Sequence, residues 1–403
     1  MDVTYERCCG MDVHKKTVVA CVVTPESQST RTFSTMTSGL LEMADWLAEQ
    51  RVTHVAMEST GVYWKPVYNL LEDDFEVMVV NARHIKTVPG RKTDVKDAEW
   101  IASLLRHGLL RASFIPDRPQ RELRELTRYR RSMIEERSRV VNRIQKVLEG
   151  GNVKLSSVAT DILGVSGRAM LDAMVRGVDD PEQLAQLARG RLRNKQHALE
   201  QALAALMSDH QRMMLRSQLS HLDFLDIQID KLSQEVAERM APLVEQINLL
   251  DEIPGVGRRI AEEVLAEIGT DMSRFPSASH LASWAGLCPG NNESAGKRGS
   301  GRTRHGNNWL TKALVQAAWS AARSKDTYMA AQYRRLAARR GSKRAILALA
   351  HSLIVSIYHM LERGTRYVEL GGNYFDSRAH HYVVDSAVRR IERLGYKVTV
   401  QAA

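Results

Sequence analysis

The chain has 403 residues and a formal net charge of +10, which favours polyanionic partners such as nucleic acid. Its 44% hydrophobic content excludes disorder throughout, and its length predicts two or three domains. The four cysteines form no CxxC pair, which excludes a disulfide framework and a cysteine zinc site and indicates a reducing cytoplasm. The N-terminus lacks the pattern of a secretory signal.

The first 115 residues alternate strand-like and helix-like segments. Two β-branched runs, 8–13 and 17–23, are separated by three residues, which is typical of a hairpin. Further strands are expected at 30–36, 54–57 and 75–80, and helices at 40–50, 62–72 and 94–105. The pattern predicts an α/β domain over residues 1–115 that opens with a hairpin.

Residues 116–250 are predicted to form a helical, coiled-coil-like linker. Its first segment is expected over 120–149. Residues 118–146 include ten basic and four acidic residues, and Arg124, Arg128 and Arg131 are expected to contact nucleic acid. A second segment, 195–247, has an apolar stripe from Leu222 to Leu243 with alternating spacings of three and four. An intramolecular helical hairpin and an intermolecular dimerising coil both fit this stripe.

A third domain is expected over residues 251–375, followed by a tail, 376–403, of unknown role. It begins with the word Ile253-Pro254-Gly255-Val256-Gly257, which suits either a phosphate-holding helix-hairpin-helix turn or an ordinary turn between packed helices. The uncharged stretch 345–361 is too short and too polar for a membrane span, so we expect a buried helix and no membrane association.

Four carboxylates are candidates for a metal site. Asp12 and Glu58 end predicted strands, while Asp94 and Asp97 lie three residues apart at the start of a predicted helix. Strand ends are where the sites of α/β sheets gather, and carboxylate oxygens suit a pair of divalent cations such as Mg²⁺. Alternatively, each is a solvated residue, or a helix cap in the case of Asp94.

A glycine-rich basic loop over residues 286–310 is a candidate for phosphate contact. It contains Ser294 and Ser300, which are equal candidates for a nucleophile on the residues alone. The basic side chains expected to contact nucleic acid there are Lys297, Arg298, Arg302 and Arg304. A flexible RNA- or DNA-binding loop without a nucleophile is the alternative.

The densest positive run lies between residues 334 and 344. It consists of Arg334, Arg335, Arg339, Arg340, Lys343 and Arg344, with no acidic residue among them. Contact with a nucleic-acid backbone is favoured over a merely solvated helix face. The neighbouring Tyr328, Tyr333 and Trp319 suit either base stacking or core packing.

Several short sequence motifs, taken together and in their order along the chain, resemble those of one protein family. They are Gly10-Met11-Asp12-Val13-His14-Lys15, Met57-Glu58-Ser59-Thr60-Gly61, Thr93-Asp94-Val95-Lys96-Asp97-Ala98, Pro254-Gly255-Val256-Gly257, Ser294-Ala295-Gly296 and the closing Leu370-Gly371-Gly372-Asn373-Tyr374-Phe375. The chain resembles the insertion-sequence one-ten transposases, which are bacterial DEDD recombinases.

This resemblance implies an RNase H-like (RuvC-like) N-terminal domain, a coiled-coil linker and a mainly helical transposase domain. It implies that Asp12, Glu58, Asp94 and Asp97 bind Mg²⁺, and that Ser294, ahead of Ser300, attacks the phosphodiester. It also implies a noncoding guide RNA that pairs with donor and target DNA. A cytoplasmic, nucleoid-associated homodimer or homotetramer is expected.

Two rival functions remain open at this point. A Mg²⁺-dependent RuvC-like nuclease or junction resolvase would hydrolyse DNA with the carboxylates alone, and the serine would be incidental. A non-enzymatic RNA-binding assembly protein would use the carboxylates only structurally.

Overall fold

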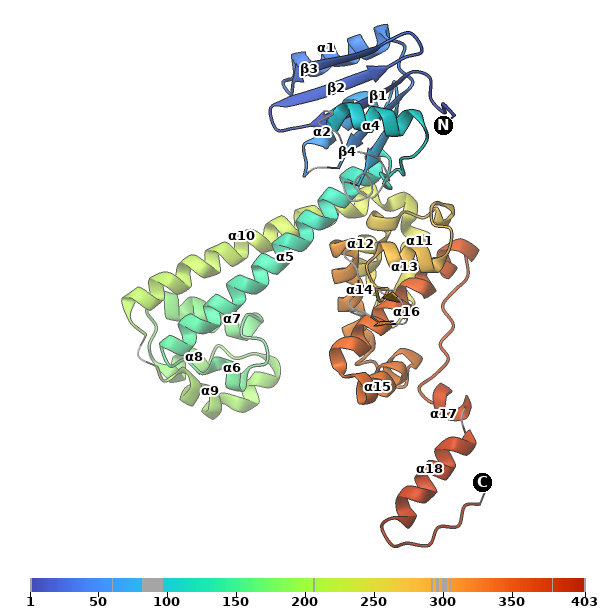
Figure 1. Cartoon of the computed structure of the whole chain (residues 1–403). Helices are drawn as coiled ribbons and strands as arrows, with labels where there is room; N and C mark the ends of the chain where they lie inside the picture. The colour runs from blue at the N-terminus through green and yellow to red at the C-terminus, as the bar shows by residue number, and fades with distance from the viewer. Residues whose placement is uncertain are drawn as a thin grey trace. The chain divides into compact units, whose positions relative to one another are not determined.

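The chain folds into two compact units, Met1–Asp117 and Arg118–Ala403. The structure is a computed structural model that describes residues 2–59, 61–81, 97–205, 207–290, 293–294, 297–298, 303, 306–378 and 380–401. Figure 1 labels the helices and strands β1 to β4. The first unit is α/β and the second is mostly helical, which confirms the predicted combination of an α/β domain with a mainly helical region.

A mixed five-stranded sheet forms the centre of the first unit, in the order β3-β2-β1-β4-β5. The strands are β1 (Cys8–Val13), β2 (Thr17–Val23), β3 (Gln28–Ser34), β4 (His54–Glu58) and β5 (Glu76–Val80). The first three run antiparallel to one another, while β4 lies parallel to β1 and β5 lies parallel to β4. The opening hairpin predicted from the β-branched runs is therefore confirmed.

Helices cover both faces of this sheet, because strand residues point alternately to one face and the other. On one face, Cys9 and Met11 belong to the core formed with α1 (Thr37–Glu49) and α2 (Trp64–Leu71). On the other face, β1 packs against α4 (Asp97–Arg106). A Cβ on Gly10 would lie 2.2 Å from the backbone nitrogen of Ala102, so only glycine allows this close approach.

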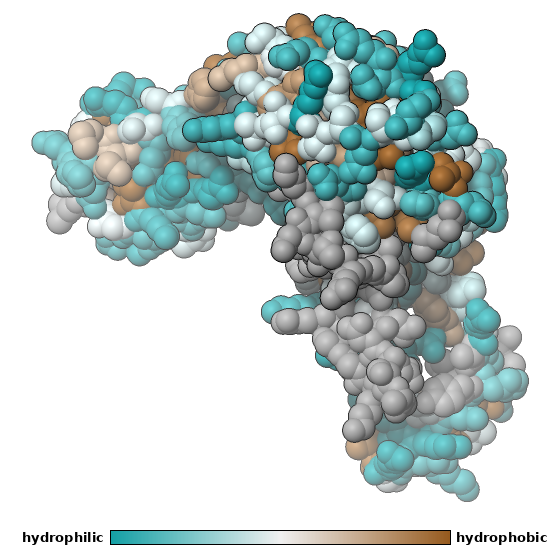
Figure 2. All heavy atoms as spheres, turned by 45° about the horizontal axis from the view of Figure 1, so that its top comes forward, coloured by the Kyte–Doolittle hydropathy of each residue, from teal (hydrophilic) through white to brown (hydrophobic). Residues whose placement is uncertain are grey.

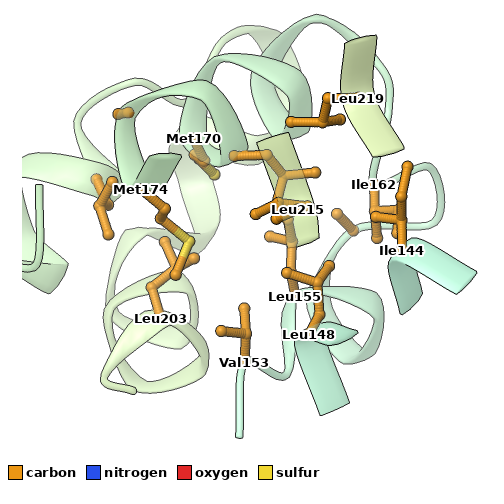
Figure 3. Packing of buried hydrophobic residues seen from close by; sticks show 14 of the residues in the cluster. Ile144, Leu148, Val153, Leu155, Ile162, Met170, Met174, Leu203, Leu215 and Leu219 are labelled. Atoms are coloured by element: carbon orange, nitrogen blue, oxygen red, sulfur yellow. The ribbon is translucent and has the colours of Figure 1, made fainter. Parts of the chain in front are cut away.

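Two long helices, α5 (Arg118–Gly150) and α10 (Asp209–Arg239), lie against each other at the start of the second unit (Figure 1). The segment between them contains α6 (Leu155–Val158), α7 (Val165–Val175), α8 (Pro181–Ala185) and α9 (Gln196–Leu203). Figure 3 shows side chains of α5, α7, α9 and α10 converging in one apolar core that includes Ile144, Met170, Leu203 and Leu215. The segment between the two predicted helical stretches of the linker is thus part of a packed subdomain.

The predicted helical segment over residues 195–247 is not one helix. It is divided after Leu203, and α10 begins anew at Asp209 behind a capping box. The Ser208 side chain accepts a hydrogen bond from the Gln211 backbone nitrogen, and the Gln211 side chain accepts one from the Ser208 backbone nitrogen. These two contacts satisfy backbone donors that the first turn of a helix leaves free.

The apolar stripe on α10 packs within its own chain. Leu222, Leu225 and Ile229 are all buried, and the first two share a core with Val140 and Ile144 of α5. This arrangement is the intramolecular hairpin, one of the two alternatives that the spacing allowed. The stripe is therefore not free to form an intermolecular coil.

The remaining helices build a second core around α16 (Ser342–Arg363). They are α11 (Val244–Asp251), α12 (Arg258–Ile268), α13 (Ala278–Trp284), α14 (Asn308–Ala321) and α15 (Tyr328–Arg340). Helices α17 (Tyr374–Arg378) and α18 (His380–Glu392) follow along the chain. By length and composition α16 is apolar enough to cross a membrane. However, Leu349, Leu353 and Ile357 are fully buried against neighbouring helices, so the expectation of a buried core helix is confirmed. In the view of Figure 2, hydrophilic residues cover most of the described surface.

A row of carboxylates on α12 binds the arginines of α5. Arg130 donates to Glu262 at 2.8 Å, and each of these residues is less than 5% exposed. Arg128 binds Glu267 with two hydrogen bonds of 2.7 and 2.8 Å, and Arg131 donates to Glu263. Charges taken out of water need such partners, so these pairs fix the register between the two helices.

Gly10→Ala is expected to destabilise the α/β unit by about 2 kcal/mol, since the added methyl group meets backbone atoms of α4 that cannot rotate away. Gly150→Ala is the matched control, because a Cβ there would only touch the end of the Gln211 side chain at 3.6 Å. Urea unfolding followed by circular dichroism measures both changes. Equal stabilities of the two variants would contradict the proposed steric constraint.

Glu262→Gln is expected to cost about 3 kcal/mol, because it leaves the buried Arg130 guanidinium without a counter-charge. Arg130→Met is expected to cost less, since Glu262 keeps Arg258 as a partner at 3.0 Å. Glu235→Gln removes an exposed charge that pairs with Arg239 and should leave stability unchanged. Thermal unfolding of the three variants checks this order, and a Glu262→Gln variant as stable as Glu235→Gln would refute it.

Candidate functional site

Two of the four predicted carboxylates lie next to each other at the end of adjacent parallel strands. Strands β1 and β4 are paired up to Met11 and Met57, so Asp12 and Glu58 occupy the next register position. Because Met11 and Met57 point into the core with α1 and α2, their neighbours Asp12 and Glu58 project from the opposite face, which α4 covers. The strand ends thus deliver both carboxylates to one side of the sheet.

Helix α4 brings a third carboxylate to this side. Its first residue is Asp97, and the following turns pass directly over Gly10, two residues before Asp12 on the same face of β1. Burial raises the pKa of Asp12, the neighbouring carboxylates of Asp97 and Glu58 raise it further, and His14 lowers it. The Asp12 carboxylate therefore lies within electrostatic reach of both Asp97 and Glu58.

The side chains of Asp12, Glu58 and Asp97 do not surround a common position that a metal ion could occupy. Among the described residues, no three His, Cys, Asp or Glu side chains are close enough to hold one metal ion. Asp94, the fourth predicted ligand, lies outside the described residues. The donor set itself, carboxylate oxygens of aspartate and glutamate, fits the ligand preference of Mg²⁺ and similar hard cations.

His14 is a member of this site that the sequence interpretation missed. Its Nε2 atom lies 3.0 Å from the Oδ2 atom of Asp12. The signal was present in the sequence, because His14 follows Asp12 by two residues directly after the strand end at Val13, and a backbone that stays extended there places both side chains on one face. The imidazole therefore forms a hydrogen bond or, when protonated, an ion pair with this carboxylate.

The turn between α11 and α12 is a packing element. A Cβ on Gly255 would lie 2.5 Å from backbone atoms of Ala317 and Ala321 on α14, and this glycine has a positive φ of 90°. Ile253 and Val256 are buried beside it. Gly257, by contrast, faces open space just before the first turn of α12, so the packed side and the open side of this turn are distinct.

The predicted serine loop is closed at its base. A Cβ on Gly306 would lie 2.3 Å from the backbone nitrogen of Gly286, so the two ends of the loop touch. Within it, β6 (Glu293–Ser294) pairs with β7 (Lys297–Arg298), and Ser294 lies opposite Lys297 in this short hairpin. Only the backbone of these four residues is described, and the predicted site residues Ser300, Arg302 and Arg304 lie outside the described residues.

Asn307 ties the end of this loop to the arginine-binding row on α12. Its side chain caps α14 by accepting hydrogen bonds from the backbone nitrogens of Trp309 and Leu310. Its Nδ2 atom donates to Glu267 at 2.7 Å. Glu267 therefore contacts both Arg128 of α5 and Asn307 at the start of α14.

The predicted nucleic-acid contacts divide into two groups. Arg124, Arg128 and Arg131 are engaged by Glu267 and Glu263, which differs from the role predicted for them. The six basic residues of α15 and α16 are exposed instead, and no carboxylate of the described chain lies within 4.0 Å of them; they are Arg334, Arg335, Arg339, Arg340, Lys343 and Arg344.

Comparison with known proteins places both units in one class of enzymes. Residues 9–152 match a family model described as a transposase, and residues 247–334 match one for the transposase IS116/IS110/IS902 family. An uncharacterised 43.6 kDa protein of insertion element IS110 from Streptomyces coelicolor is 31% identical over 69% of this chain and 73% of its own length. A pilin gene-inverting protein of Moraxella lacunata is 25% identical over 71% of this chain and 73% of its own length.

These matches cover the strand ends that carry Asp12 and Glu58, the start of α4 and the serine loop. They also agree with the family that the sequence words indicate. The chain belongs to the IS110 family of insertion-sequence transposases and is a DNA transposase or recombinase.

Proposed function

We propose that this transposase cuts and rejoins DNA strands through a covalent phosphoserine intermediate formed by Ser294. The serine Oγ atom would attack a backbone phosphorus, lose its proton to a nearby base and displace one sugar oxygen. The resulting phosphoserine ester conserves the energy of the broken bond, so a second strand can reverse the step without ATP. Family membership and the position of Ser294 in the closed glycine-rich loop support this proposal.

The observation that supports it most is that Asp12, Glu58 and Asp97 all lie on one side of the sheet. Together with Asp94 they would hold Mg²⁺, which when bound polarises a phosphate and stabilises a leaving oxygen. The mixed sheet with helices on both faces supports an RNase H-like classification of this unit. His14 would orient the Asp12 carboxylate through their hydrogen bond.

Target choice would be delegated to a noncoding guide RNA that pairs with donor and target DNA. The protein would then supply shape and charge, for which the unpaired cations of α15 and α16 are suited. Lys297, Arg298, Arg302 and Arg304 would neutralise charge that develops on the phosphate. We expect a cytoplasmic homodimer or homotetramer that associates with the nucleoid when it acts.

Ser294→Ala is expected to abolish a covalent protein–DNA adduct on labelled element-junction DNA in the presence of Mg²⁺ and copurifying RNA, because the nucleophile is lost. Ser300→Ala, the matched control in the same loop, should keep the adduct. A denaturing gel separates the adduct from free DNA. Cleavage without an adduct in the wild type, and at equal rates in Ser294→Ala, would establish a metal-dependent nuclease instead.

Asp12→Asn is expected to reduce strand cleavage at least 100-fold, since a neutral amide binds divalent cations weakly. Asp45→Asn makes the same chemical change on α1, which packs on the other face of the sheet, and should leave cleavage unchanged. Cleavage rates are measured over a Mg²⁺ titration. Full activity of Asp12→Asn would assign the carboxylates a structural role and favour the RNA-binding assembly protein.

A further inference from the structure

A pocket of about 450 Å³ lies between α15 and α17, away from both the carboxylates and the serine loop in the sequence. One stripe of α15 lines it at helical spacing, and α17 closes it. The lining residues are Tyr328, Gln332, Arg335, Leu336, Arg339, Phe375 and Arg378. This volume falls within the ~300–1,000 Å³ typical of pockets that hold small organic ligands.

The inner part of the pocket is apolar and aromatic. The rings of Tyr328 and Phe375 stack with centroids 5.1 Å apart, and Leu336 lies in the same lining. The Glu369 carboxylate accepts hydrogen bonds from the backbone nitrogens of Tyr328 and Gly371, at 2.6 and 2.8 Å. These contacts fasten the segment before α17 to the start of α15, so the aromatic wall is built into the fold.

The rim of the pocket is positively charged and lacks counter-charges. Arg335, Arg339 and Arg378 contribute guanidinium groups, and within the described chain none of them lies within 4.0 Å of a carboxylate. The Arg335 guanidinium lies 5.1 Å from the centroid of the Phe375 ring. Three cations beside an apolar surface suit a ligand that combines an aromatic group with negative charge.

Gln332 forms part of the pocket wall. Its Nε2 atom donates to the Ser352 hydroxyl at 2.9 Å, which fixes the orientation of the amide. Its Oε1 atom is buried and accepts no hydrogen bond from the part of the chain that the structure describes. Because this oxygen is closed to solvent, the amide serves as a fixed part of the pocket wall.

We propose that this pocket binds an unpaired nucleotide of a nucleic-acid strand. The base would pack against Tyr328, Leu336 and Phe375. The flanking phosphates would bind Arg335, Arg339 and Arg378. A paired base would not fit this role, because its faces are covered by its neighbours in the duplex.

The inference rests on the proposed function only in that the chain handles nucleic acid. It extends that function by assigning α15 and α17 to the recognition of single-stranded segments, and it gives the residues that follow Phe375 a role through Arg378. Binding to this pocket requires no strand cleavage. A failed adduct test with Ser294→Ala and a failed binding test here are therefore distinguishable outcomes.

The test compares two double variants of the full-length protein. Arg335→Ala/Arg339→Ala removes two charges from the pocket, and Arg334→Ala/Arg340→Ala removes two equally exposed charges from the same helix outside it. Fluorescence anisotropy measures their affinity for labelled single-stranded RNA, single-stranded DNA and duplex DNA of the same sequence. Circular dichroism confirms that each variant is folded.

The pocket variant is expected to lose about tenfold more affinity for a single strand than the control, while both lose affinity for the duplex equally. The single strand that shows the larger loss, RNA or DNA, identifies the source of the nucleotide. Equal losses for both double variants on every probe would overturn the proposal and leave only general electrostatic attraction.

Phe375→Leu tests the base contact separately from the charges. It keeps an apolar side chain but removes the stacking surface, so affinity for a normal strand should fall about fivefold. Affinity for an abasic strand, which keeps its phosphates but lacks bases, should not change. An equal loss on both strands, or no loss on either, would refute insertion of a base.

Discussion

The buried pair between Arg130 and Glu262 is the contact on which the helical unit depends. Both charges are removed from water, so neither helix can slide without leaving one of them uncompensated. Glu267 extends the same row and binds Arg128 as well as Asn307, the cap of α14. The carboxylates of α12 thus fix the long helix α5 and the point at which the serine loop ends.

The carboxylate site depends on a different constraint, the close approach of α4 to β1. Only a residue without a side chain at position 10 lets the backbone near Ala98 and Ala102 lie directly on the strand. That approach sets Asp97 beside Asp12, and the parallel register of β4 adds Glu58. Repulsion among these carboxylates is a cost of folding that a bound divalent cation would relieve.

Much of this architecture could be predicted because its signals are local. The β-branched runs and their ends predicted the positions of Asp12 and Glu58, the charged helical segment 120–149 predicted α5, and the uncharged stretch 345–361 predicted α16. The break before α10 was also readable, since Ser208 and Gln211 have the spacing of a capping box. The carboxylate partners of the α5 arginines could not be predicted from the sequence. Glu262 follows Arg130 by 132 residues, and only the packing of the two helices brings the two side chains together.

Net charge alone does not predict which arginines bind nucleic acid, because some arginines are paired with carboxylates of the same chain and others are not. A chain with a net charge of +10 favours polyanions, but composition does not tell which cations face them. On α5, internal carboxylates neutralise the guanidinium groups and hold the fold together. On α15 the guanidinium groups are exposed without such partners and lie beside aromatic rings. Because a phosphate competes poorly with a buried carboxylate that is already in contact, we expect the exposed cations of α15 and α16 to contribute more to nucleic-acid binding than the arginines of α5.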